Sequence, residues 1–262
     1  EAGAIVVNLF KGVTSPGGAT GAGDRALDGA ISGLIEDGEI TGKEGELTLI
    51  HTLGKMAAPR VLVAGLGEAG SFDIDGVRKV AAQACRFLRE KGVKTVATIA
   101  HGAGIVGLDA KDSAQAIAEG SLLGLYRFDK YKSRNEDARS VKELRIVVLD
   151  GSKLDAIREG VSAGAALAEA VILCRDMANE PANEMTPTAM SEAALAVSRD
   201  AGLKIEVFDR SWMVERGMGA FLGVAQGSEQ PPKLIVLRYD GDPDDPSNSL
   251  ALVGKGITFD TG

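Results

Sequence analysis

The stretch RVLVAGLGEAGSFDIDGVRKVAAQACRFLREKG, residues 60–92, joins a strand pattern to a helical one. Arg60–Gly65 predicts a buried strand, because apolar and β-branched residues follow one another without a break. Gly76–Lys91 predicts a helix, because its apolar residues recur at helical spacing and a glycine follows its end. Either Asp73 or Asp75 can cap its first turn. A strand followed by such a helix is the repeating unit of α/β proteins.

The same alternation extends over the first 150 residues. A helix is expected at Asp112–Leu125, and a charged surface loop follows at Arg127–Arg139. This pattern predicts an α/β fold whose mostly parallel or mixed sheet is covered on both faces. The further predicted strands are Ala4–Leu9, Glu46–His51, Thr95–Ala100 and Leu144–Asp150.

A long alanine-rich helix is predicted at Asp155–Asn179, with a length of roughly 37 Å at 1.5 Å per residue. Its length and place indicate a connector between domains. We therefore expect an N-terminal α/β domain at 1–154, a linking helix at 155–179 and a second domain from residue 180 to 262.

The second domain restarts at Thr186-Pro187, an N-cap followed by proline at the first helical position. The sequence stops at Gly262 inside a glycine-flanked segment, so we expect the chain to be a piece of a longer protein. The predicted elements are a helix to about Asp200, strands Lys204–Phe208, Lys233–Tyr239 and Leu250–Val253, a short helix near Ser211–Arg216 and a glycine-rich turn Gly217–Gly227.

Composition excludes several classes of function. The 262 residues have a formal net charge of −8 and contain no apolar stretch long enough for a membrane helix. An acidic surface repels phosphate backbones, so nucleic acid is not expected as a partner. Cys85 and Cys174 are expected to be reduced, buried thiols of a cytosolic protein. With only His51 and His101, an HExxH zinc site is impossible.

Two glycine motifs resemble catalytic or cofactor motifs. Gly65–Gly70 matches GxGxxG, but Ser71–Asp75 separates it from the helix, so a loop with close backbone approach is the better interpretation than a dinucleotide site. Gly160–Gly164 matches GxSxG but lies inside the long helix, not at a strand-to-helix turn. Its small residues are expected to let another element pack closely. His101 is expected to be a hydrogen-bonded loop histidine.

The strongest functional pattern is LVGKGITFDTG, residues 252–262. Lys255 and Asp260 lie at the end of an apolar strand, where unpaired charges are costly, so a ligand site or a salt-bridged strand end is expected. Residues five apart in a regular strand face opposite sides, so the two can share a site only if the backbone bends. Gly256 can supply that bend because it lacks a Cβ atom.

This segment resembles the signature of the leucyl aminopeptidase family, approximately VGKG-[IV]-TFDSGG, with Thr261 where serine is usual. Similar agreement extends over Arg175–Asn183 with Thr186-Pro187, over Gly217–Ser228 and over Pro232–Leu237. The resemblance implies a macro-like N-terminal α/β domain, a long linking helix and the first part of an α/β metallopeptidase catalytic domain.

The resemblance further implies a metal-dependent exopeptidase, a hydrolase that releases N-terminal amino acids of the leucine type from peptides. Lys255 would ligate metal through its neutral amine, and Asp260 would be a carboxylate ligand close to both of two divalent ions, Mn²⁺ or Zn²⁺. These ions would activate a hydroxide and bind the peptide's carbonyl and free amine. The family implies a cytoplasmic homo-hexamer.

The family's second lysine, its active-site arginine and its other carboxylate ligands would lie beyond Gly262, so no catalytic residue is expected within this chain. We therefore expect it to be inactive without the missing C-terminal portion of the catalytic domain. An alternative is a macro-like module that binds a nucleotide or ADP-ribose through glycine loops at Gly65–Gly70 and Gly102–Gly107. A third possibility is a non-catalytic assembly unit.

Overall fold

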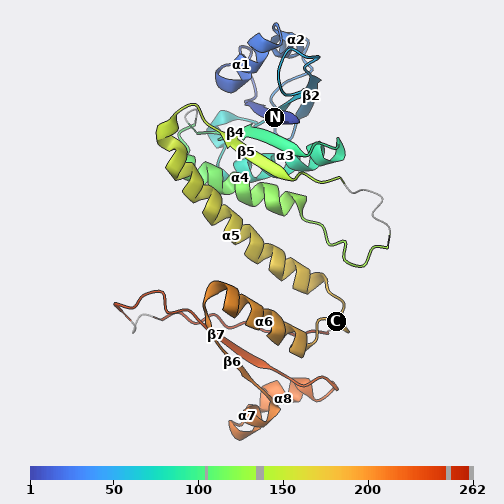
Figure 1. The fold of residues 1–262 in the computed structure, drawn as a ribbon, viewed down its shortest axis with the longest axis vertical. Helices are drawn as coiled ribbons and strands as arrows, with labels where there is room; N and C mark the ends of the chain where they lie inside the picture. The colour runs from blue at the N-terminus through green and yellow to red at the C-terminus, as the bar shows by residue number, and fades with distance from the viewer. Residues whose placement is uncertain (104–105, 134–138, 246–248, 260–262) are drawn as a thin grey trace. The chain divides into compact units, whose positions relative to one another are not determined.

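A computed structural model describes residues 1–103, 106–133, 139–245 and 249–259. The chain divides into two compact units, Glu1–Cys174 and Arg175–Gly262 (Figure 1). In the described ranges, no helix is both long and apolar enough to cross a membrane.

The first unit contains a five-stranded sheet in the order β2-β3-β1-β4-β5. Strand β1 lies at its centre and runs parallel to both β3 and β4, while β2 pairs antiparallel with β3 at one edge. The predicted mixed, mostly parallel sheet is therefore confirmed. The strands are β1 (Ala4–Leu9), β2 (Leu47–His51), β3 (Arg60–Gly65), β4 (Thr95–Ile99) and β5 (Glu143–Val147).

Side chains on alternate positions of β1 supply two separate cores, one on each face of the sheet. Val6 packs against α3 (Ile74–Glu90) in one core, as the period of two in a strand requires. Val7 packs in the other core with residues that lie in or next to α1 (Gly18–Ala26) and α2 (Ala30–Glu36). The expected coverage of both faces is confirmed, although the sequence analysis did not predict α1 or α2.

Three helices of the first unit pack through glycines that bring backbones close together. A Cβ atom built on Gly120 of α4 (Ala110–Leu125) would lie 2.3 Å from the Arg78 carbonyl oxygen of α3. A Cβ atom on Gly164 of α5 (Leu154–Asn179) would lie 2.4 Å from the Gln115 carbonyl oxygen of α4. Figure 1 shows α5 beside α4. The GxSxG match therefore lies within a helix and serves close packing, as predicted.

The second unit contains a two-stranded antiparallel sheet, β6 (Lys204–Phe208) with β7 (Leu234–Arg238). Helix α6 (Pro187–Ala201) begins as predicted, because the Thr186 side chain accepts a hydrogen bond from the Ala189 backbone N–H. The remaining helices are α7 (Arg210–Glu215) and α8 (Gly219–Ala225), and short 3₁₀ turns lie in the first unit at Ala69–Ser71 and Gly151–Lys153.

Three expectations were wrong. The glycine-rich turn Gly217–Gly227 contains helix α8, because its apolar side chains pack toward α7. Leu250–Val253 is not a strand but an exposed irregular segment, since no described strand hydrogen-bonds with it. Cys174 is a free thiol but exposed, because it lies beyond the α5 residues that pack on α4, whereas Cys85 is buried.

Candidate functional site

Lys255 lies in the irregular segment that follows residue 249, and its side chain is exposed. Among the residues that the structure describes, it belongs to no strand and forms no ion pair. Its amine is therefore accessible to a ligand, and the salt-bridged strand end considered for this lysine is not formed by any described carboxylate.

The glycine beside Lys255 makes a close contact with α6. A Cβ atom built on Gly256 would lie 3.1 Å from Sδ of Met190 and 3.6 Å from its Cε. Gly256 is not among the glycines with positive φ. Its lack of a side chain therefore gives Met190 room, and no left-handed turn occurs at this position.

Asp260, the other predicted ligand, lies outside the described residues. Across the described ranges, no group of three or more His, Cys, Asp or Glu side chains could hold a metal ion. The donor types suit a divalent metal, since a neutral amine and a carboxylate both ligate such ions. The described segment supplies one of these donors.

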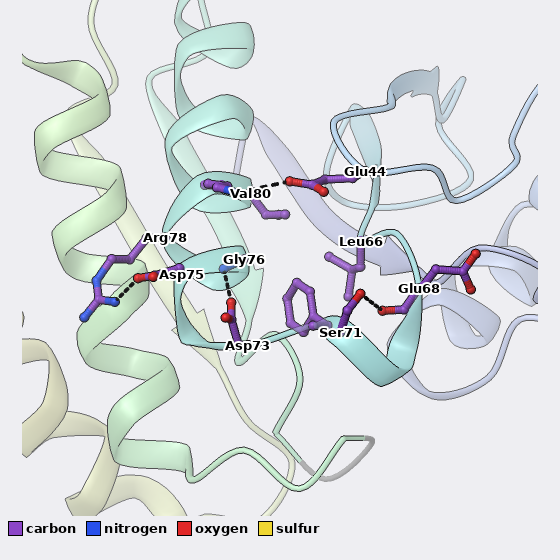
Figure 2. A pocket seen from close by; sticks show the side chains of 11 residues that line it. Glu44, Leu66, Glu68, Ser71, Asp73, Asp75, Gly76, Arg78 and Val80 are labelled. Carbon is purple, nitrogen blue, oxygen red and sulfur yellow. Dashed lines mark hydrogen bonds and ion pairs between the residues drawn. The ribbon is translucent and has the colours of Figure 1, made fainter.

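The GxGxxG loop lies beside a pocket of about 430 Å³ at the start of α3 (Figure 2). A Cβ atom on Gly65 would lie 2.0 Å from the Lys43 carbonyl oxygen, which confirms the close backbone approach expected here. Carboxylates outnumber basic groups in the lining, which disfavours an anionic ligand. The charged lining residues are Glu44, Glu68, Asp73, Asp75, Arg78 and Lys79.

These lining charges are already paired. Asp73 caps α3 by accepting from the Gly76 backbone N–H at 2.9 Å, and Asp75 pairs with Arg78 at 2.7 Å. Lys79 lies 3.4 Å from Glu44. Figure 2 shows the Asp73–Gly76 and Asp75–Arg78 contacts. Helix capping and surface ion pairs therefore account for these charged lining residues without a ligand.

His101 follows β4 and is fully buried. Its Nδ1 lies 3.1 Å from Asn8 Nδ2, and its Nε2 lies 3.1 Å from Thr98 Oγ1. Because the Asn8 amide donates to Nδ1, Nε2 carries the proton and donates to Thr98. Ser113 Oγ donates to the His101 carbonyl oxygen at 2.9 Å. Burial lowers the pKa of His101 to about 4, so the ring is neutral at pH 7.

This network confirms the prediction of a hydrogen-bonded loop histidine. His51 is exposed at the end of β2. The second glycine loop proposed for phosphate binding, Gly102–Gly107, contains two residues outside the described ranges. Its Gly102 is packed, since an added Cβ atom would lie 2.6 Å from Leu108 Cδ1.

No sequence pattern indicated the Met190 contact, because a methionine at helical spacing in α6 is equally expected of a core residue. The contact becomes visible only when α6 and the Lys255 segment are placed in space.

Both units of the chain match models of one known protein family. The model of the cytosol aminopeptidase family N-terminal domain matches residues 6–135, and the model of that family's catalytic domain matches residues 172–262. A probable cytosol aminopeptidase of Alkaliphilus metalliredigens (strain QYMF) is 38% identical over 260 residues, which are 98% of this chain and 52% of that protein. The cytosol aminopeptidase of Pseudomonas aeruginosa PAO1 is 38% identical over 240 residues, 91% of this chain and 48% of that protein. The chain thus spans about half the length of these curated relatives.

Solved structures share the fold. The bottromycin maturation enzyme BotP in complex with Mn has a TM-score of 0.72 and 28% identity, over 92% of this chain and 46% of that one. A mutant of tomato leucine aminopeptidase has a TM-score of 0.75 and 22% identity, over 90% of this chain and 48% of that one. The α/β fold with its parallel-dominated sheet is therefore that of these enzymes. The two domain models of this one family together match most of the sequence, and the chain belongs to the cytosol aminopeptidase family.

Proposed function

We propose that this chain is part of a metal-dependent aminopeptidase that releases N-terminal amino acids, of the leucine type, from peptides. The observation that carries the proposal is Lys255, an exposed lysine without a described ion-pair partner in the segment that matches the family's catalytic domain. The curated relatives are named aminopeptidases, and their names support the same activity.

Lys255 and Asp260 would contribute to the site of two divalent ions, Mn²⁺ or Zn²⁺. When bound, such ions supply Lewis acidity toward the peptide carbonyl and a contact for the substrate's free amine, which an internal peptide bond lacks. Lys255 would donate the electron pair of its neutral amine, and Asp260 would neutralise positive charge. BotP, a structural neighbour that was solved with Mn, supports a metal in this fold.

The donors within these residues are fewer than a two-metal centre needs, so the rest of the active site would lie outside them. We therefore propose that the 262 residues alone neither assemble the centre nor hydrolyse peptides. The complete protein would be a cytoplasmic homo-hexamer acting on peptides, without membrane or nucleic-acid partners. The word cytosol in the relatives' names agrees with the proposed location.

A chimera provides the test: this chain extended by the remaining half of the Alkaliphilus metalliredigens relative. We expect the chimera to hydrolyse leucine amide in the presence of Mn²⁺, and the 262 residues alone to be inactive. Lys255→Ala and Asp260→Ala should each abolish hydrolysis and reduce bound metal. Unchanged hydrolysis and metal content in both variants would rule out the assignment of these ligands.

A further inference from the structure

The segment that carries Lys255 has little regular structure of its own to fix its position. From residue 250 to 257 its residues are exposed and form neither helix nor strand. A ligand must be held near its productive geometry, because each misplaced donor weakens the metal site. A contact that fixes the backbone next to Lys255 is therefore functionally significant.

Met190 makes that contact from a well-anchored position. It lies in the first turn of α6, where its backbone N–H donates to the Thr186 carbonyl oxygen at 2.9 Å. The Thr186 hydroxyl caps the same turn by accepting from Ala189 at 3.2 Å. The start of α6 is thus fixed locally, and the half-buried Met190 side chain extends from it.

The thioether of Met190 reaches the backbone of the segment at Gly256. Its Sδ would lie only 3.1 Å from a Cβ atom at this position, so the close approach depends on glycine. Consecutive Cα atoms are about 3.8 Å apart, so the fixed point is immediately beside Lys255. A flexible, polarisable side chain suits packing against an irregular backbone.

We infer that Met190 is a positioning residue, which packs against Gly256 and so holds the Lys255 backbone where its amine can ligate metal. This inference rests on the proposed function. Met190 touches neither metal nor substrate and acts through Lys255. Outer-shell groups that orient metal ligands by hydrogen bonds typically change metal affinity by roughly 10- to 100-fold when they are lost, and we expect an effect of this order from the Met190 contact.

The first measurement is ¹⁵N relaxation of the Lys255 and Gly256 amides in the 262-residue chain, because NMR order parameters report fast backbone motion. Met190→Ala should lower the order parameter of the Gly256 amide, while Met190→Leu, which keeps most of the volume, should restore it. Met218→Ala is the matched control, because Met218 is also a half-buried methionine of the second unit and precedes α8. An order parameter that is unchanged in Met190→Ala would overturn the inference.

The second measurement is Mn²⁺ titration of the chimera, read by electron paramagnetic resonance. Met190→Ala should bind Mn²⁺ roughly tenfold or more weakly, and activity should return as Mn²⁺ is raised. Met190→Leu should bind close to wild type, and Met218→Ala like wild type. A lower order parameter at Gly256 with unchanged Mn²⁺ affinity would also overturn the inference, because the role of Met190 would then be structural alone.

The two proposals fail differently. If Lys255→Ala leaves Mn²⁺ binding unchanged, or the wild-type chimera binds none, the proposed function fails and takes this inference with it. If Lys255→Ala abolishes Mn²⁺ binding while Met190→Ala has no effect, only the role of Met190 is refuted.

Discussion

A Cβ atom on Gly160 of α5 would lie 2.1 Å from the carbonyl oxygen of Lys111 in α4. No side chain can occupy that space unless the two helices move apart. Gly160→Ala should therefore destabilise the first unit by about 1–3 kcal/mol, the usual range for overpacking. Urea unfolding followed by circular dichroism measures the change.

Gly33 in α2 is the matched control, because it is a helical glycine with open space where a Cβ atom would be. Gly33→Ala should stabilise by about 0.5–1 kcal/mol through the lower backbone entropy of the unfolded chain. Ser162→Ala, at the exposed serine of the GxSxG match, should leave stability unchanged. Equal effects at Gly160 and Gly33 would contradict the close helix packing.

Asp73, and not Asp75, provides the N-cap of α3, a choice that the sequence left open. Asp73→Ala should cost about 1 kcal/mol of stability, because the Gly76 N–H loses its acceptor. Asp75→Ala should cost less, since it removes an exposed ion pair with Arg78. Chemical unfolding of both variants measures the difference, and a larger loss for Asp75→Ala would show that the cap is wrongly assigned.

Protonation of buried His101 should make the first unit acid-sensitive. Burial lowers its pKa to about 4 in the folded state, whereas the unfolded-state pKa is about 6.5. Above pH 6.5 the ring is neutral in both the folded and the unfolded state, so the His101 contribution to the free energy of unfolding is fully present. Between pH 6.5 and 4 only the unfolded chain takes up the proton, so stability falls with pH by a total of about 3 kcal/mol.

The check is the free energy of unfolding at pH 7 and pH 5 for wild type and His101→Gln. The variant should be less stable at pH 7, because it disrupts the contacts with Asn8 and Thr98, but it should lose less stability on acidification. His51→Gln is the control at an exposed histidine and should retain the wild-type slope. An unchanged slope in His101→Gln would mean that other groups cause the acid sensitivity.

The acidic lining of the pocket beside α3 predicts that the first unit does not bind a pyrophosphate. Glu44, Glu68, Asp73 and Asp75 surround the space that the GxGxxG loop would offer. Isothermal titration of the chain with ADP-ribose should therefore give no saturable heat. Saturable binding would revive the nucleotide-module alternative and would require that these carboxylates leave the pocket.

Local sequence patterns predicted most of the first unit, because its elements are specified by their own residues. The α3 apolar spacing, the β-branched run of β1 and the alanine-rich pattern of α5 all predicted the observed elements within a few residues. Helix α1 was missed, because glycines at three of its nine positions read as a loop. It forms because tertiary packing outweighs the low helix propensity of glycine.

The second unit shows where sequence patterns fail. Leu250–Val253 has the composition of a strand, but a strand needs a neighbour for its backbone hydrogen bonds, and the described sheet β6–β7 provides none. The sequence indicated Lys255 because a charged side chain at the end of an apolar run is costly unless it is paired or bound to a ligand. The contact between Gly256 and Met190 joins residues that are distant in the chain, so sequence spacing alone could not predict it.

The metal content of the chimera in its Lys255→Ala form tests the central claim most directly. Lys204→Ala is the control, because Lys204 is an exposed lysine of the same unit that pairs with Asp240. We predict that Lys255→Ala, after dialysis against Mn²⁺ and removal of free metal, retains less metal than wild type, whereas Lys204→Ala retains the wild-type amount. Equal metal in all three proteins would contradict the assignment of Lys255 as a ligand.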